Sequence, residues 1–245
     1  MAHSFRGLAH SLLDVVFPRN CVIDGAPVEE TSPYQFIGRA AAEKIFHVEP
    51  PHCRTCGFPY FGAVMASDRA CPKCKELKPV YNEGRTVILV EGVSRELIHG
   101  FKYNGSTFLL RDFQAIFENC RWLPSYLEGA RLVPVPLHPR KFRERGFNQS
   151  EELCRALTRI QPTASLANIL VRTIDTPSQT RFSRKERLRN LKMAFRLAPG
   201  VSLNPEDRYI IVDDVFTTGS TVNSCARVLR KERIQRIDIL TLGHG

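Results

Sequence analysis

Five short apolar runs in the last two thirds of this 245-residue chain constrain the fold more than any other feature of the sequence. They show little alternation of polar and apolar residues, which is typical of strands buried on both faces. The runs are TVILVEG (86–92), LVPVP (132–136), NILVR (168–172), YIIVD (209–213) and IDILTLG (237–243). Helical periodicity is found between them, at Leu97–Phe101, Phe108–Asn119, Ser150–Thr158 and Thr221–Lys231. Together these patterns predict an α/β fold in which helices cover both faces of a parallel sheet.

The first third of the chain has a different texture. Residues 1–82 are rich in cysteine, proline and short turns, and regular periodicity is poor after the first segment. The apolar strands and helical patterns begin at about residue 83. The sequence therefore predicts a small N-terminal module over 1–82 and an α/β domain over 83–245.

The first residues of the chain predict an amphipathic helix rather than an export signal. Asp14 and Arg6 interrupt its apolar run, and no small-residue cleavage site follows. The apolar face comprises Leu8, Leu12, Val15 and Val16. No run of 18 apolar residues occurs anywhere, so we expect no membrane insertion. With eight cysteines and no export signal, reduced thiols and a cytoplasmic location are expected.

Four of the cysteines have the spacing of a metal site. Cys53 and Cys56 form one Cys-x2-Cys pair, and Cys71 and Cys74 form a second pair after fourteen intervening residues. Each pair can turn both sulfurs toward one ion, and the intervening length allows a hairpin that brings the pairs together. Four thiolates suit a closed, structural Zn²⁺ site. Free thiols and an iron–sulfur cluster remain as alternatives.

The net charge of +10 is concentrated in one part of the chain. Between Arg131 and Arg196 there are 15 basic and 5 acidic residues, so this segment accounts for the whole excess. A localised basic surface favours an anionic partner such as phosphate, pyrophosphate or nucleic acid. A solvated, arginine-rich surface that serves only solubility is the alternative.

Two adjacent acids follow the apolar run 209–212. Asp213 and Asp214 are expected at the carboxyl edge of the sheet, where open α/β folds bind ligands. The acids can reach two ribose hydroxyls, or one can serve a metal ion. The turn that follows suits an anion because it offers hydroxyls, backbone amides and a helix N-terminus. Its residues are Thr217, Thr218, Gly219, Ser220 and Thr221. Carboxylates beside such a turn indicate a sugar phosphate; a capped strand–turn–helix corner is the alternative.

The segment VPVPLHPRKFRERGFNQS (133–150) offers a second anion site. It follows a strand with a proline-rich turn, which would hold backbone amides in place. Arg140 and Lys141, together with His138, are candidates to bind a pyrophosphate leaving group. His138 and His99 are also candidates for a general base, although a structural role is the alternative for each.

A third basic segment, TRFSRKERLRNL (180–191), is interpreted as a flexible loop. Its basic residues include Arg181, Arg184, Lys185 and Arg189. Arg181, Lys185 and Arg189 recur every four residues and share a face if the segment is helical. The segment can cover an anionic ligand or contact nucleic acid, with a solvated helix face as the alternative. Few aromatics interleave with these charges, so the sequence does not indicate a stacking platform for single strands.

The stretch YIIVDDVFTTGST (209–221) resembles the signature of type I phosphoribosyltransferases, which bind phosphoribosyl pyrophosphate (PRPP). The resemblance implies that Asp213 and Asp214 contact the ribose 2- and 3-hydroxyls and that the following turn holds the 5-phosphate. A Gly-x-Gly-x-x-Gly dinucleotide fingerprint is absent from the sequence. The sequence therefore favours PRPP over a dinucleotide.

The order of the motifs along nearly the whole chain resembles the ComF family, which includes ComFC and GntX. The four-cysteine module is followed by LIHGFKYNG (97–105), by segments 133–150 and 175–195, and by the signature 209–221. The resemblance implies a phosphoribosyltransferase fold with an N-terminal zinc ribbon, and PRPP bound with Mg²⁺. Members often carry a further N-terminal Cys-x2-Cys, whereas this chain has Cys21 with Asp24, so we expect one zinc ion.

The resemblance also implies a role in natural transformation, with single-stranded DNA and other competence proteins as partners; gluconate utilisation is the role of GntX-like members. As an enzyme, the chain would transfer a phosphoribosyl group with release of pyrophosphate, Asp213 and Asp214 acting as catalytic residues that position the ribose. As a binding module, it would sense PRPP or bind DNA without turnover. A regulatory or assembly protein is a third hypothesis, because a ligand site alone does not fix a reaction.

Overall fold

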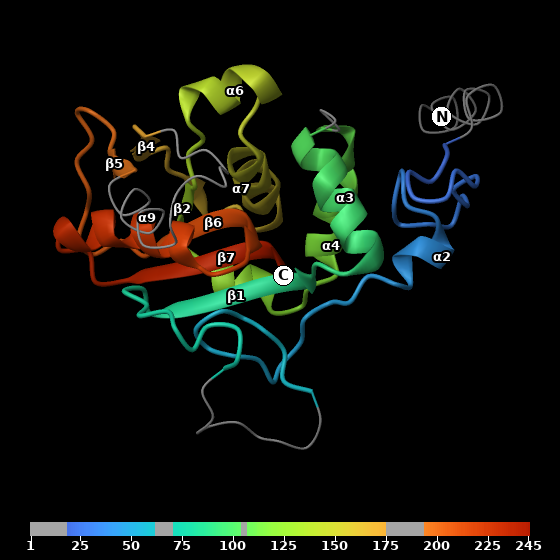
Figure 1. The fold of residues 1–245 in the computed structure, drawn as a ribbon, viewed down its shortest axis with the longest axis horizontal. Coiled ribbons are helices and arrows are strands. Elements are labelled where there is room, and N and C mark those ends of the chain that lie inside the picture. Colours follow the sequence, from blue (N-terminus) through green and yellow to red (C-terminus); the bar gives the residue numbers. More distant parts are fainter. Residues whose placement is uncertain (1–18, 62–70, 104–106, 175–193) are drawn as a thin grey trace, which may run out of the picture.

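The computed structural model describes residues 19–61, 71–103, 107–174 and 194–245. The expected N-terminal helix and the basic loop with Arg181, Arg184, Lys185 and Arg189 lie outside the described residues. Within them, the core is a five-stranded sheet in which every neighbouring pair is parallel. Its order is β1 (Glu83–Leu89), β7 (Ile237–His244), β6 (Tyr209–Phe216), β2 (Arg131–Pro134) and β3 (Ser165–Leu166). The predicted parallel sheet is therefore confirmed (Figure 1).

The helices follow the predicted periodicity. Those that pack on the sheet are α3 (Gly92–Tyr103), α4 (Leu110–Glu118), α5 (Leu123–Leu127), α7 (Gln149–Ile160) and α9 (Ser220–Lys231). Shorter elements are α2 (Arg39–Ala42), η1 (Thr107–Leu109) and α6 (Pro139–Arg145). The four helices expected from the sequence are confirmed as α3, α4, α7 and α9. None of the described helices has the length and apolar character needed to cross a bilayer.

The central strands divide their side chains between two apolar cores. On β6, Ile210 and Val212 join a core with α3, α4, α5, α7 and residues 21–45. Tyr209 and Ile211 point to the other face, where the core includes α9 and the four cysteines. Both faces of the strand are buried, which explains why its sequence lacks alternation.

The strand expected at 168–172 lies outside the parallel sheet, which corrects the prediction. Residues Leu170–Arg172 form β4 and pair antiparallel with β5 (Phe195–Leu197). The edge position beside β2 is taken instead by the two-residue β3. An apolar run indicates a strand but does not identify its partner, so the sequence could not distinguish these pairings.

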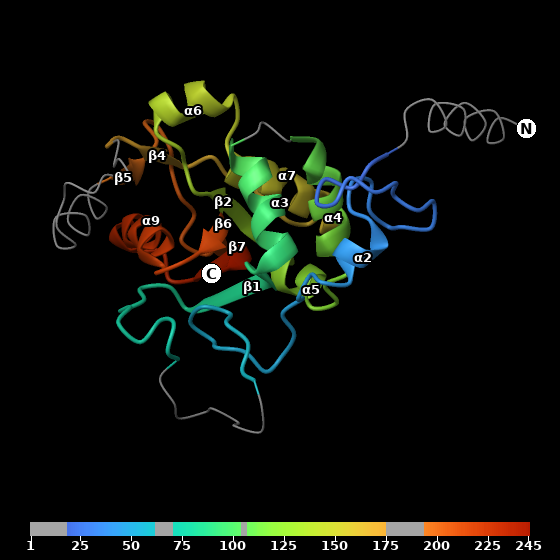
Figure 2. The ribbon, with the colours of Figure 1, turned by 45° about the vertical axis from the view of Figure 1, so that its right-hand side comes forward.

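The cysteine-rich segment packs directly against β1, as the cyan trace beneath β1 shows in both views (Figures 1 and 2). A Cβ on Gly57 would lie 2.5 Å from the backbone nitrogen of Thr86, and one on Gly84 would overlap the carbonyl of Thr55. The Tyr81 hydroxyl donates a hydrogen bond to the Thr55 carbonyl at 2.8 Å. Glycines therefore allow the segment to approach the edge strand closely.

Candidate functional site

Asp213 and Asp214 lie near the carboxyl end of β6. The strand continues to Phe216, so both acids lie among its last four residues rather than after its end. The Lys102 ammonium, from α3, forms an ion pair with Asp214 Oδ1 at 3.0 Å. The Ser150 hydroxyl, from the first turn of α7, donates to Asp213 Oδ1 at 3.1 Å. The two carboxylates are therefore held by different elements.

The environment of Asp213 favours its protonated form. Burial and, after it, the neighbouring Asp214 charge raise the pKa of this carboxyl to about 7. Lys102, the amide of Asp214 and the Ser150 hydroxyl act in the opposite direction. An acid poised near neutrality ionises readily when a ligand supplies hydroxyl donors or a nearby cation, so the pair suits a ribose or a bound metal ion.

The turn after β6 places exposed hydroxyl side chains beside the N-terminus of a helix. Thr217 and Thr218 are exposed, and Thr218 donates a hydrogen bond to Ser220 Oγ at 3.0 Å. Gly219 caps α9 in the left-handed region with φ 71°, and α9 begins at Ser220. The first amides of a helix have no intrahelical acceptor and, with the helix dipole, favour an anion. The turn is therefore compatible with a bound anion.

The strand β2 pairs with β6 in parallel, so the segment after β2 reaches the same edge of the sheet. This segment contains α6, where the His138 side chain caps the helix by accepting from the Arg140 amide at 3.3 Å. Arg140 is exposed and Lys141 half-buried, and Arg140 lies 3.6 Å from Glu144. His138 has a capping role that the sequence did not reveal.

The parallel pairing of β2 with β6 thus brings three predicted groups to one edge: the acids on β6, the turn before α9 and the basic helix α6. The sequence did not assign Lys102 or Ser150 to this site. Both occur in the segments that carry the family resemblance, LIHGFKYNG and RGFNQS, which was the available signal. Asn148 caps α7 and donates to the Val135 carbonyl at 3.1 Å, which fixes Ser150 near β2 and β6.

The four cysteines form one cluster, as their spacing predicted. All four sulfurs lie within 4.8 Å of one another. Cys53 Sγ lies 3.7 Å from Cys74 Sγ, and Cys56 Sγ lies 3.7 Å from Cys71 Sγ. Sulfurs at about 2.3 Å from a tetrahedral Zn²⁺ would be about 3.8 Å apart, so this donor set can hold zinc. Hydrogen bonds, chiefly from the Cys56 thiol, lower the pKa of Cys53 to about 4 and favour a thiolate there.

Residues 20–27 fold in the same way as the first cysteine pair. The Cys21 amide donates to the Ala26 carbonyl and the Gly25 amide to the Cys21 carbonyl, at 2.7 and 2.9 Å. Residues 53–58 repeat this pattern at 2.8 Å for both bonds, and each turn has a glycine at φ 74°. Asp24 occupies the place of the second cysteine. The knuckle conformation therefore does not depend on a second thiol.

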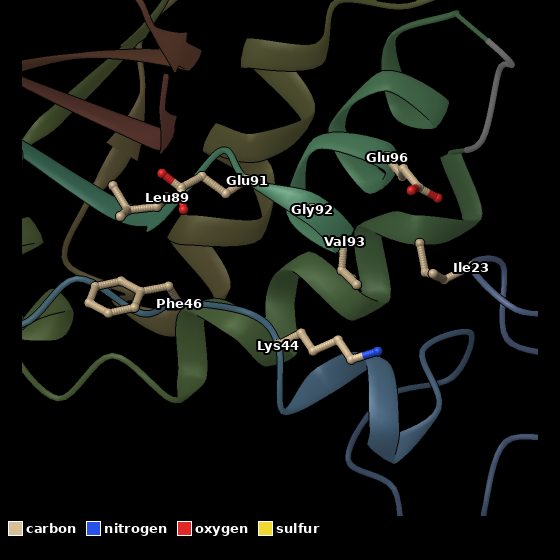
Figure 3. A pocket seen from close by; sticks show the side chains of 8 residues that line it. All are labelled: Ile23, Lys44, Phe46, Leu89, Glu91, Gly92, Val93 and Glu96. Carbon is tan, nitrogen blue, oxygen red and sulfur yellow. The ribbon is translucent and has the colours of Figure 1, made fainter.

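A cavity of about 480 Å³ lies at the start of α3, apart from these groups. Its lining residues come from segment 23–46, the end of β1 and α3 (Figure 3). They are Ile23, Lys44, Phe46, Leu89, Glu91, Gly92, Val93 and Glu96. None of them belongs to the predicted site.

The described residues thus define an α/β protein with a four-cysteine module and an anion-compatible edge. The chain belongs to the ComF family of competence proteins. It is 32% identical over 203 residues to Competence protein F of Haemophilus influenzae, covering 80% of this chain and 85% of that protein. It is also 32% identical over 200 residues to the DNA utilization protein YhgH of Escherichia coli K12, covering 78% and 82%.

Competence protein ComFC of Streptococcus pneumoniae is 26% identical over 175 residues, covering 69% of this chain and 74% of that protein. Among solved structures, a hypoxanthine phosphoribosyltransferase from Staphylococcus aureus matches with a TM-score of 0.36 and 18% identity. That match covers 55% of this chain and 64% of the solved chain. No protein-family model matches the sequence.

Proposed function

We propose that this protein binds PRPP with Mg²⁺ at the carboxyl edge of the sheet. Asp213 and Asp214 accept hydrogen bonds from the ribose hydroxyls, and the phosphate loop, Thr217–Thr221, holds the 5-phosphate. The observation that carries the proposal is the placement of two carboxylates directly before an exposed hydroxyl turn at a helix start. A sugar phosphate presents the complementary groups in the same order: hydroxyls that can donate to the carboxylates, and a dianion that suits the turn.

The pyrophosphate of the ligand belongs near α6 in this proposal. His138, Arg140 and Lys141 follow β2 and reach the edge that carries the acids. Transfer breaks the bond between the anomeric carbon and the pyrophosphate oxygen and forms a bond to an acceptor nucleophile, whose proton passes to solvent or a base. Bound Mg²⁺ would offset charge on the leaving group. Basic side chains stabilise that charge as it develops.

Two further parts of the chain complete the proposal. Zn²⁺ held by Cys53, Cys56, Cys71 and Cys74 would have a structural role, because four thiolates leave no open position. The basic loop at Arg181, Arg184, Lys185 and Arg189 would cover the ligand. Its flanks meet, since the Thr173 amide donates to the Ala194 carbonyl at 2.8 Å. We expect the protein to be cytoplasmic. We also expect the boundary between its two domains to lie between residues 82 and 83.

The biological role that we propose is the handling of incoming DNA. Relatives carry the names Competence protein F and DNA utilization protein, which motivates this role. Single-stranded DNA and other competence proteins would be partners. A second candidate function, direct binding of single strands, is favoured by one surface. The Arg145 guanidinium lies 5.1 Å from the ring centroid of Tyr103, which is 62% exposed, and Phe142 of α6 is 46% exposed.

The decisive test is a calorimetric titration of PRPP into the protein with Mg²⁺. The control is the double variant Asp213→Asn/Asp214→Asn, which removes both charges at nearly constant volume. We expect saturable heat for the wild type and at least a roughly hundredfold weaker affinity for the variant, since two charge-assisted contacts are lost. Absence of heat at millimolar PRPP would overturn the proposal.

A further inference from the structure

The segment between Cys74 and β1 touches the phosphate loop. The Leu77 amide donates to the Cys74 carbonyl at 2.9 Å, so Leu77 follows directly from the cysteine turn. Its side chain packs on the capping glycine of α9, because a Cβ on Gly219 would lie 2.8 Å from Leu77 Cδ2. Figures 1 and 2 show this segment, in teal, beneath α9. One leucine thus joins the cluster to the turn that we assign to phosphate.

A buried asparagine makes the second connection. Asn223, 5% exposed on α9, accepts a hydrogen bond from the Val80 amide at 2.9 Å and donates to the Lys78 carbonyl at 3.0 Å. The backbone amide of Asn223 donates a hydrogen bond to the Gly219 carbonyl at 2.9 Å. Asn223 therefore fixes the phosphate loop and the segment after Cys74 relative to each other. Substitution by alanine would remove the partner of the Val80 amide and of the Lys78 carbonyl.

An aromatic stack makes a third, independent connection. Phe58, two residues after Cys56, contacts the His244 ring at a centroid distance of 5.1 Å. His244 stacks on Phe216, the last residue of β6, at 4.9 Å. Phe216 in turn lies against Gly219, since a Cβ there would be 2.5 Å from its ring. The four cysteines and Phe216 belong to one apolar core.

We propose that Leu77 and Asn223 are positioning residues for the phosphate loop, through which the four-cysteine cluster controls the affinity of that loop for its ligand. The cluster fixes the backbone at Cys74. Leu77 and Asn223, which contact both the following segment and the phosphate loop, hold Gly219 in a fixed position relative to it. An anion site made of backbone amides binds well only if those amides are already oriented, because ordering them on binding costs free energy. The part of this inference that concerns PRPP affinity rests on the proposed function.

Hydrogen exchange measured by mass spectrometry on the full-length, zinc-loaded protein tests the inference without any ligand. In Leu77→Ala and Asn223→Ala we expect exchange over 217–224 to rise by about tenfold, because local opening becomes easier. The zinc content should stay at the wild-type value. The conservative variant Leu77→Met should restore protection. Leu203→Ala, which removes a partly buried leucine from the same core on the amino side of β6, should leave 217–224 unchanged.

The affinity arm uses PRPP with Mg²⁺ on the same variants. We expect Kd to rise about five- to tenfold for Leu77→Ala and Asn223→Ala, and to stay within about twofold for Leu77→Met and Leu203→Ala. Exchange over 217–224 and Kd both within twofold of the wild type in Leu77→Ala and Asn223→Ala would overturn the inference. If the wild type itself binds no PRPP, the proposed function fails, and the exchange data still decide the positioning role.

Zinc removal provides a reversible version of the test. Chelation should raise exchange over both 53–60 and 217–224, and added Zn²⁺ should reverse both changes. Faster exchange over 53–60 with no change over 217–224 would show that the cluster and the phosphate loop are uncoupled, and would overturn the inference. This arm requires no substitution, so a variant that fails to fold does not affect it.

Discussion

At the scale of single residues, the acidic pair on β6 is costly unless a cation or a ligand accompanies it. Asp213 and Asp214 are adjacent, and the second is only 9% exposed. Lys102 forms an ion pair with Asp214, and burial raises the pKa of Asp213, which favours its neutral form. A ligand that brings hydroxyl donors and a divalent cation would replace these compensations. PRPP with Mg²⁺, the ligand that we propose, would supply both the hydroxyls and the cation.

The raised pKa of Asp213 predicts that PRPP binding strengthens with rising pH. The carboxyl ionises as the pH passes about 7, and the ionised form accepts hydrogen bonds from a ribose hydroxyl and an amide more strongly than the neutral acid does. Titrations with Mg²⁺ should show about tenfold tighter binding at pH 8 than at pH 6. The same shift makes Asp213 lower the folding stability between pH 4 and 7 as pH rises, because the folded state holds the proton more tightly.

Lys102→Gln supplies the control for this pH dependence. The groups that face Asp213 are Asp214 on β6, Lys102 on α3, Ser150 on α7 and Cys225 on α9. The Lys102 charge lowers the pKa of Asp213, so its removal should move the midpoint of the binding profile to higher pH. A midpoint that stays in place or moves down would show that another group, such as the ligand phosphate, sets the profile.

At the scale of elements, the periodicity of the sequence predicts which segments form strands and which form helices. Runs without alternation predicted β1, β2, β6 and β7, and helical spacing predicted α3, α4, α7 and α9. Pairing partners are not encoded locally, so residues 168–172 were placed in the wrong sheet. The contact of Leu77 with Gly219 joins segments far apart in the chain, and no local pattern reports it.

The candidate site shows the same division between local and long-range information. Spacing alone predicted the four-cysteine cluster, because each pair is a local turn and four thiols suit a single metal site. Asp213 and the phosphate loop were predicted because they are contiguous. Lys102 and Ser150 come from α3 and α7, and their approach to the acids depends on how these helices pack.

The turn before α9 gives a prediction at this scale. Gly219 has φ 71°, and an added Cβ would lie 2.5 Å from the Phe216 ring and 2.8 Å from Leu77. Gly219→Ala should cost about 2 kcal/mol or more of unfolding free energy and weaken PRPP binding, because strain and overlap add. Thermal unfolding and calorimetry measure the two effects. Gly200→Ala is the matched control, since Gly200 has φ 74° with nothing within 4 Å. Equal losses in the two variants would assign the effect to backbone strain alone.

At the scale of the whole molecule, the cysteine module is part of the sheet's support. Segment 53–60 packs on β1, and segment 77–82 contacts α9 and β7. Cys53→Ser should therefore release zinc and also lower the cooperative unfolding temperature of the whole chain, by several degrees, because metal binding couples to folding. Metal analysis and calorimetry test this. Cys154→Ser, at a buried cysteine outside the cluster, should retain zinc. Unchanged metal content in Cys53→Ser would contradict the four-thiolate assignment.

The net charge of +10 and its concentration in one segment predict salt-sensitive binding of single-stranded DNA. Phosphates contacted by Arg143 and Arg145 release counterions, and Tyr103 offers an exposed ring for a base. Fluorescence anisotropy with oligo-dT should show that the logarithm of the association constant falls linearly with the logarithm of the salt concentration. The expected slope is about −0.7 per phosphate contact. Arg143→Gln should make the slope shallower by about 0.7, the value for one phosphate contact, whereas Tyr103→Ala should weaken binding at every salt concentration. Phe108→Ala, at an aromatic 45% exposed that packs on Phe36, is the control and should bind as the wild type does. Absence of a complex at 50 mM salt would contradict this prediction and leave PRPP as the anion that we propose for this protein.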